Sequence, residues 1–235
     1  MSARWVPRML TPDQKRIRVT SYEGLLARYR VNPKHFLLRF VTMDETWVHH
    51  FDPESKRQSM QWKHTSSPPP KKFRAVPSAG KIMPSVFWDA GGILYVDCLE
   101  RGATITGDYY AQLIPQVREA IKEKRSGKLR RGVLFHHDNA PAHTSHVAVA
   151  AIKAAGFELV ELPPHSPDLA PSDYFLFPKL KEYLRGKKFA SDDAVMSAVQ
   201  EWFEEQSPDF FRTGIQRLEH RWQKCIEVQG DYVEK

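Results

Sequence analysis

Three aspartates are candidates for a metal site, and two of them lie in apolar surroundings where a carboxylate without a partner costs free energy. Asp44 lies within an apolar stretch, and Asp138 ends the apolar run 132–137. Asp173 follows with 34 residues between it and Asp138. Three converging carboxylates repel one another, so at least one pKa should rise unless a hard divalent cation binds among them. The pattern predicts that all three aspartates are catalytic and bind metal.

Such a site suits phosphoryl transfer. Two Mg²⁺ ions roughly 3.5–4 Å apart activate an attacking oxygen and stabilise the leaving oxygen. The attacking oxygen would belong to water or to a DNA 3′-hydroxyl. We expect Mg²⁺ as the natural cofactor, two ions per active site, with Mn²⁺ as a substitute.

Histidines near Asp138 offer an alternative. They could form a zinc site or a histidine-based acid–base pair, but no HExxH pattern is present, and Cys98 and Cys225 match no ligand spacing. We favour positions that support the metal ligands or face DNA. The four histidines are His136, His137, His143 and His146. The DNA contacts expected around Asp138 are His137, Asn139 and His143.

The elements that must position these residues follow from hydrophobic patterning. Runs rich in β-branched and aromatic residues predict strands at 36–41, 81–88, 93–99, 132–137 and 157–162. Helices are predicted over 109–124 and 142–155. The first three strands suit an antiparallel triple, and helical crossovers extend it in parallel.

This order predicts an α/β fold with a ribonuclease H-like mixed five-stranded sheet flanked by helices. Ligands of such sheets gather outside the carboxyl ends of neighbouring strands. Asp44 follows the first strand and Asp138 the fourth, which are neighbours in that plan. Asp173 then lies in the first turn of a helix capped by Ser172 and completes the site.

Both ends of the chain are predicted to be helical. Thr11, Pro12 and Gln14 form a capping box, and Asn32-Pro33 ends that helix. Its apolar stripe comprises Ile17, Leu25, Leu26 and Tyr29. Two C-terminal helices begin at Ser191 and Ser207, and the last carries a stripe that we interpret as packing: Phe211, Ile215, Leu218, Trp222 and Ile226.

A long basic loop follows the first strand. Residues 50–77 are rich in proline and cations and poor in periodic apolar residues. Loops longer than about 12–15 residues without regular structure are uncommon and are usually functional or disordered. A flexible surface insert is the alternative to a DNA-contacting role. The expected DNA contacts are Lys56, Arg57, Lys63, Lys71, Lys72 and Arg74. A second basic stretch occupies Lys122 to Arg131.

The overall charge agrees with a polyanionic partner. The chain has 35 Lys and Arg against 28 Asp and Glu, a net charge of +7 and a pI near 9.4. No apolar run approaches the roughly 18 residues needed to span a membrane. The N-terminal residues lack a signal-peptide core, so we expect a protein that is neither secreted nor membrane-bound.

Three sequence blocks resemble the signatures of the mariner transposases: 44–47, 137–144 and 166–174. The 34 residues between Asp138 and Asp173 match the spacing by which that family names its aspartate triad. Trp5-Val6-Pro7 is similar to the family's inter-domain linker, although Arg8-Met9-Leu10 departs from its usual continuation.

The resemblance implies a transposase catalytic domain that cuts both strands at transposon ends and joins them to a TA target. It implies a nuclear homodimer, formed through the linker and a clamp-like loop at 50–77, that binds terminal inverted repeats. We divide the chain into linker and first helix, 1–33, and catalytic domain, 34–235. The family's N-terminal helix-turn-helix domains are expected to be absent.

Two other functions remain possible from sequence. A domesticated module would bind DNA or dimerise with residual or no nuclease activity, and its DNA affinity would fall with salt. A ribonuclease of the same fold would instead cleave RNA–DNA hybrids. The long basic loop argues against the ribonuclease.

Overall fold

The computed structural model describes residues 6–55, 57–60, 62–64, 66–68, 76–99 and 102–233. Four of the expected DNA contacts, Lys56, Lys71, Lys72 and Arg74, lie outside this part of the chain, as does Trp5 of the linker-like motif. No helix among the described residues is long and apolar enough to cross a membrane.

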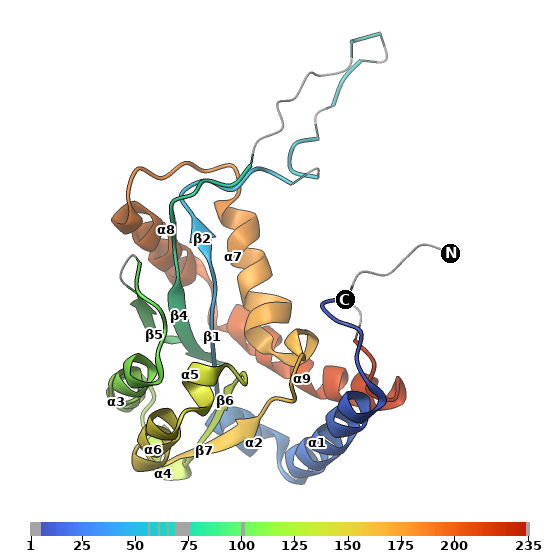
Figure 1. Cartoon of the computed structure of the whole chain (residues 1–235), viewed down its shortest axis with the longest axis vertical. Coiled ribbons are helices and arrows are strands. Elements are labelled where there is room, and N and C mark those ends of the chain that lie inside the picture. The colour runs from blue at the N-terminus through green and yellow to red at the C-terminus, as the bar shows by residue number, and fades with distance from the viewer. Residues whose placement is uncertain are drawn as a thin grey trace.

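A five-stranded mixed sheet, in the order β5-β4-β1-β6-β7, forms the centre of the fold (Figure 1). β1 is antiparallel to β4 and parallel to β6, and β6 is parallel to β7. This arrangement confirms the ribonuclease H-like sheet predicted from sequence. The strands are β1 (Phe40–Glu45), β4 (Pro84–Asp89), β5 (Gly92–Cys98), β6 (Val133–His137) and β7 (Phe157–Glu161).

The register aligns the carboxyl ends of the two central strands. Thr42 of β1 lies beside His136 of β6 in the parallel pair, so both strands end at the same edge of the sheet. β4 runs the other way, with Asp44 opposite Val86, and its last residue Asp89 lies at the opposite edge.

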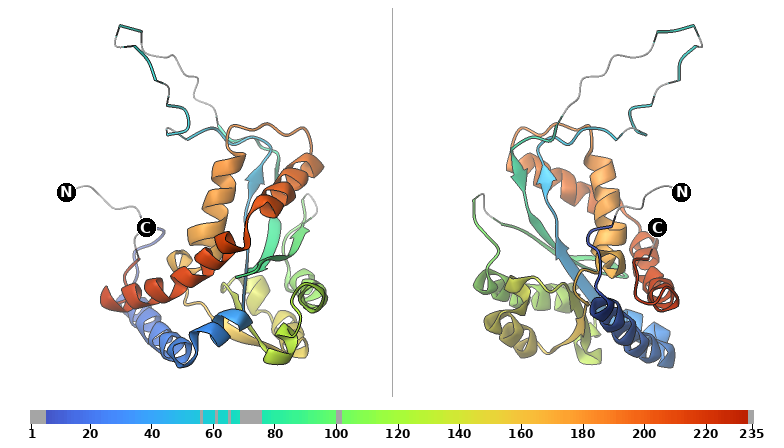
Figure 2. Two further views of the ribbon diagram at one scale, coloured as in Figure 1. Left: turned by 180° about the vertical axis from the view of Figure 1, so that it is seen from behind. Right: turned by 45° about the vertical axis from the view of Figure 1, so that its right-hand side comes forward.

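Helices cover both faces of the sheet. One core lies under α3 and α6, and the larger core lies under the remaining long helices. Helices α1 and α9 lie side by side at one corner (Figure 2). The helices of the two layers are α1 (Pro12–Val31), α2 (Pro33–Arg39), α3 (Gly107–Lys124), α4 (Lys128–Arg131), α5 (Pro141–Thr144), α6 (His146–Ala154), α7 (Phe177–Leu184), α8 (Asp192–Glu205) and α9 (Pro208–Glu227).

The predicted strand 36–41 is wrong over most of its length. Residues 33–39 form α2, and β1 begins only at Phe40. Asn32 caps α2, because its side chain accepts a hydrogen bond from the His35 N–H at 3.0 Å. Asn-Pro, interpreted as a stop, is also a good helix start, since asparagine caps well and proline suits the first helical position.

The first helix begins as predicted. The Thr11 hydroxyl accepts from the Gln14 N–H, and the Gln14 side chain accepts from the Thr11 N–H. Its buried face differs from the prediction, because Ile17 is 48% exposed while Arg18 is fully buried. Tyr22 stacks on Trp222 of α9, so α1 shares the main core and the division at residue 33 falls within one packed unit.

Asp173 lies in an unusual helical turn. Ser172–Leu176 form a π-helical turn, η2, that runs into α7. The predicted cap by Ser172 is wrong: the turn has no side-chain cap, and the Ser172 hydroxyl instead accepts from the Trp88 indole N–H at 3.0 Å. Single π-helical turns are rare and are frequent at functional sites.

The segment after β1 leaves the sheet through a short second ribbon, in which β2 (Val48–His49) pairs with β3 (Lys81–Ile82). Residues 50–52 stay against the body, where the Gly186 N–H donates to the Asp52 carbonyl at 2.7 Å, and the described residues 62–64 and 66–68 project away from it (Figures 1 and 2). Gln58 touches the body, donating from its side chain to the Glu182 carbonyl at 2.8 Å.

Candidate active site

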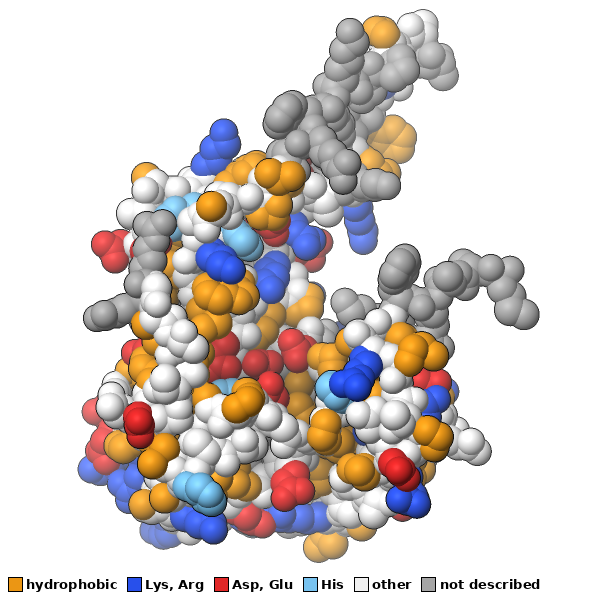
Figure 3. Space-filling model, viewed as in Figure 1, with side chains coloured by type: hydrophobic (Ala, Val, Ile, Leu, Met, Phe, Trp, Pro, Cys, Tyr) orange, Lys and Arg blue, Asp and Glu red, His pale blue; other side chains and the backbone are white. Residues whose placement is uncertain are grey.

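The three predicted aspartates meet at one edge of the sheet. Asp44 is near the end of β1, Asp138 directly follows β6, and Asp173 lies in η2. Asp138 and Asp173 line one cavity of about 320 Å³, and Asp44 interacts electrostatically with both. Figure 3 shows acidic side chains gathered in a hollow near the centre of this face.

The carboxylates repel one another. Burial, followed by the charges of Asp173, Glu45 and Asp138, raises the pKa of Asp44 well above its usual range. Burial and the charge of Asp138 raise the pKa of Asp173 to about 6, although a hydrogen bond with Asp44 opposes the rise. Simultaneous ionisation of Asp44 and Asp173 is therefore unfavourable in the absence of a cation.

This donor set fits a hard divalent cation. Carboxylate oxygens are the ligands that Mg²⁺ and Mn²⁺ prefer, and a cation would remove the repulsion that raises the two pKa values. Among the described residues, no three acidic, histidine or cysteine side chains are already placed to hold a metal ion.

Asp138 differs from its neighbours because it has positive partners. It accepts from the His143 ring at 2.6 Å and from the Ala140 N–H at 3.0 Å. Burial alone would raise the pKa of Asp138, but these hydrogen bonds outweigh it and the pKa is lowered. Asp138 is thus the carboxylate best prepared to be ionised at neutral pH.

His143 bridges Asp138 and Glu45. Its other ring nitrogen lies 3.2 Å from a Glu45 carboxylate oxygen, which also accepts from the Ser85 hydroxyl at 3.3 Å. Burial would lower the pKa of His143, but the two carboxylates raise it to about 10. His143 is therefore an imidazolium that balances part of the acidic cluster.

Burial corrects the expectation that His137 and His143 face DNA. Their exposed fractions are 7% and 1%. Nδ1 of His137 lies 3.0 Å from the Tyr110 hydroxyl, and burial together with His143 lowers the pKa of His137 to about 3. The two histidines therefore support the site from within the protein. Asn139 donates its side-chain amide to the Leu162 carbonyl but is exposed beside the aspartate cavity, so its DNA contact stays a prediction.

Comparisons with known proteins place this geometry in a family. The family described as "Transposase (partial DDE domain)" matches residues 52–131. The chain is 35% identical over 235 residues to the Mariner Mos1 transposase of Drosophila mauritiana, covering 98% of this chain and 66% of that protein. It also resembles the crystal structure of the catalytic domain of Mos1 mariner transposase, with a TM-score of 0.82, 32% identity and 100% of that chain covered. The chain belongs to the mariner transposase family.

Two further relatives show what share of a longer protein this chain matches. The chain is 34% identical to human Histone-lysine N-methyltransferase SETMAR, covering 98% of this chain but 33% of that protein. It matches the Mos1 mariner paired end complex with Mn at a TM-score of 0.90 and 33% identity, covering 68% of that chain. The chain thus spans a third to two thirds of these relatives and corresponds to the mariner catalytic domain.

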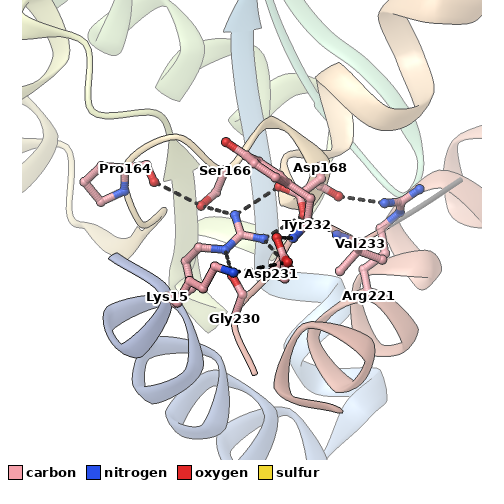
Figure 4. Close-up of polar contacts among 10 residues, drawn as sticks. Lys15, Pro164, Ser166, Asp168, Arg221, Gly230, Asp231, Tyr232 and Val233 are labelled. Carbon is pink, nitrogen blue, oxygen red and sulfur yellow. Dashed lines mark hydrogen bonds and ion pairs between the residues drawn. The ribbon is translucent and has the colours of Figure 1, made fainter. Parts of the chain in front are cut away.

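A buried arginine holds the loop that leads to Asp173. Arg18 of α1 forms two charged hydrogen bonds with Asp168, at 2.7 and 3.0 Å, and donates to the Ser166 hydroxyl at 2.6 Å (Figure 4). It also donates to the Gly230 carbonyl at 2.9 Å. The first helix and the C-terminal segment are therefore tied to the mariner signature block 166–174 through one guanidinium.

One lysine near the acidic cluster was not predicted from the sequence. Lys181 lies two helical turns after Asp173 on α7 and interacts electrostatically with Asp173, Asp52 and Asp44. Burial lowers its pKa, and these carboxylates oppose the decrease. Only its spacing from Asp173 could have indicated this position.

Two of the expected loop contacts are described. Arg57 and Lys63 are exposed, and the Lys63 ammonium donates to the Pro68 carbonyl at 2.9 Å. Both lie away from the aspartates, on the segment that projects from the body. Their predicted DNA contacts remain a prediction.

Proposed function

We propose that this chain catalyses metal-dependent cleavage of DNA phosphodiester bonds at transposon ends and transfer of the cut strand into TA target DNA. The observation that supports it most directly is the acidic cluster of Asp44, Asp138 and Asp173 on a mariner catalytic fold. We further propose that terminal inverted repeats are its substrate, and that it acts in the nucleus as a homodimer.

The three aspartates would hold one or two divalent cations, which would supply activation of the attacking oxygen and stabilisation of the leaving oxygen. His143 and the Ala140 N–H hold one oxygen of Asp138 and leave the other free for a ligand. A bound cation would favour the ionised forms of Asp44 and Asp173, whose pKa values are raised without it. Lys181 balances part of the remaining negative charge.

The decisive test is nicking of supercoiled DNA in Mg²⁺ or Mn²⁺. We expect Asp138→Ala to lose activity by roughly 10²–10³-fold or more, the cost of removing one charge-stabilising group. Asp13→Ala, which removes an exposed aspartate on α1, is the matched control and should cut like the wild type. Equal nicking by Asp138→Ala and wild type would overturn the proposal.

A second function is favoured by the human relative, in which a similar region accounts for 33% of a protein named as a methyltransferase. The chain would then serve as a DNA-binding or dimerisation module. Salt-sensitive DNA binding by the wild type, with no nicking in either metal, would support this alternative and contradict the first.

The dimer and its location have separate tests. Analytical ultracentrifugation should give twice the monomer mass of 27.2 kDa without DNA, and that mass plus the mass of the bound DNA when a transposon-end duplex is added. A monomer under both conditions would contradict a homodimer. Microscopy of the tagged full chain would show a cytoplasmic signal if the nuclear location is wrong.

A further inference from the structure

A second cavity, of about 590 Å³, opens at the edge of the sheet opposite the aspartates. Its walls come from α2, the β4–β5 turn, α4 and the start of α9. One carboxylate, Asp89, also lines it. Its cationic side chains are Lys34, Lys124, Arg125, Lys128, Arg131 and Arg212.

Asp89 does not balance these cations, because it is already paired. It is 2% exposed and accepts from Lys128 at 2.7 Å and from Arg125 at 3.0 Å. The Lys128 ammonium also donates to the Phe40 carbonyl at 3.1 Å. The buried ion pairs therefore form the floor of the cavity, and the other cations stand above them.

Two of the rim cations are free to bind a ligand. Lys34 and Arg131 are exposed, and neither side chain makes a hydrogen bond or ion pair within the described ranges. Lys124 and Arg212 do have partners, the Leu94 carbonyl and Asp209. An unpaired lysine and an unpaired arginine at one cavity mouth suit an anion with several acceptor oxygens.

The positive surface continues beyond this cavity. A neighbouring hollow of about 290 Å³ shares Arg125 with it and adds Lys122 and Arg130. Both hollows are lined by residues of the basic stretch 122–131. This stretch has no role in the proposed chemistry at the aspartates and is not part of the long loop. A row of cations across two adjoining hollows fits a linear polyanion better than a single small anion.

This surface is separate from the aspartate site. The two cavities share no lining residue, and Asp89 and Asp44 lie toward opposite ends of the paired strands β4 and β1. DNA engaged at the aspartates would not cover it.

We propose that the cavity bounded by α2, the β4–β5 turn, α4 and α9 binds the phosphate backbone of a duplex DNA segment not engaged at the aspartates. The inference rests on the proposed function, which makes DNA the expected polyanion. Phosphate contacts of this kind add affinity without reading sequence. An acidic peptide is the competing occupant.

The test compares Lys34→Ala/Arg131→Ala with the control Arg16→Ala/Lys224→Ala, which removes two exposed cations elsewhere. Binding of a blunt duplex of arbitrary sequence is followed by fluorescence anisotropy across a salt series, in chelator so that no cutting occurs. Each lost phosphate contact lowers the slope of log affinity against log salt by about 0.9. We expect the cavity variant to lose about two units of slope and the control none.

Equal slopes in the two variants would overturn the proposal. Unchanged duplex binding, with loss of polyglutamate binding only in the cavity variant, would instead identify an acidic-peptide site and also overturn it. Nicking in Mg²⁺ at saturating DNA is measured in parallel and should equal that of the wild type. If nicking is absent in every protein but the slopes still differ, the proposed function fails and the second DNA surface stands.

Discussion

The two ends of the central sheet bury aspartates in opposite ways. At one end, burial would raise the pKa of Asp89, but Lys128 and Arg125 lower it below its usual range. At the other end Asp44 has carboxylates for neighbours, and its pKa is raised well above that range. Residue type and burial are similar, so the charge of the neighbours decides the difference. The ion-paired carboxylate of Asp89 stabilises the fold, whereas the carboxylates around Asp44 have no cationic partner of this kind and suit a metal cation.

Removing Asp89 should give the largest change in stability. Asp89→Ala leaves Lys128 buried without its partner, which costs about 3–5 kcal/mol of unfolding free energy. Urea unfolding measures this, with Asp209→Ala, at an exposed position on α9, as the control. A loss within about 1 kcal/mol, the range of surface ion pairs, would show that Asp89 and Lys128 are not a structural pair. Asp89→Ala combined with Lys128→Met should recover part of the loss.

The acidic end should respond to pH in the opposite direction. The folded-state pKa of Asp173 is about 6, above its ordinary value, so the folded protein holds a proton that the unfolded chain releases. Without metal, the contribution of Asp173 to stability should therefore fall as pH rises from about 4 to 6, by about 1–2 kcal/mol after allowance for solvent screening, while the lowered pKa of His137 contributes in the opposite direction over the same range. The Asp89 pair contributes stability at high pH and loses it only as the pH falls through its lowered pKa.

Thermal unfolding in chelator across this pH range tests the difference between the two ends. The stability of the wild type minus that of Asp173→Asn should decrease across this range, and added Mg²⁺ should raise the stability of the wild type, because binding to the folded state stabilises it. A difference between the two proteins that stays constant from pH 4 to 6 would contradict the raised pKa of Asp173.

The smallest effect is expected at the bridge between Asp138 and Glu45. Glu45→Gln removes one of the two carboxylates that raise the pKa of His143 to about 10. In the metal-free protein, the His143 pKa should fall while the ring stays protonated at pH 7, because Asp138 remains. NMR titration of the imidazole measures the change, with Glu119→Gln, on an exposed part of α3, as the control. An unchanged pKa would remove Glu45 from the cluster.

The sequence predicted the acidic end well because its signals are local. Asp44 and Asp138 each follow an apolar run, and the order of strands and helices brings those runs together. The capping box at Thr11 was also predicted, since all its atoms lie within one turn. Features built from neighbouring residues leave a pattern that can be read.

The paired end could not be predicted in this way. Asp89 and Lys128 lie 39 positions apart in the sequence, beyond the reach of any local motif, and neither lies in a signature block. No pattern in the sequence indicates that Arg18 is buried; the tertiary fold places Ser166 and Asp168 against it. Buried ion pairs depend on contacts that only the complete fold creates.

The π-helical turn at Ser172–Leu176 also limits how this chain can evolve. A π turn holds one residue more than an α-helical turn, as an insertion into an α-helix would produce. Deleting one residue from it would replace the wide turn with a regular α-helical turn and change the direction in which Asp173 leaves the backbone. Asp173 would turn away from Asp138 while the core beneath α7 stayed intact. A deletion in this turn should therefore abolish catalysis but leave the protein folded, because it moves Asp173. Point substitutions at Asp173 would abolish catalysis by changing the side chain instead.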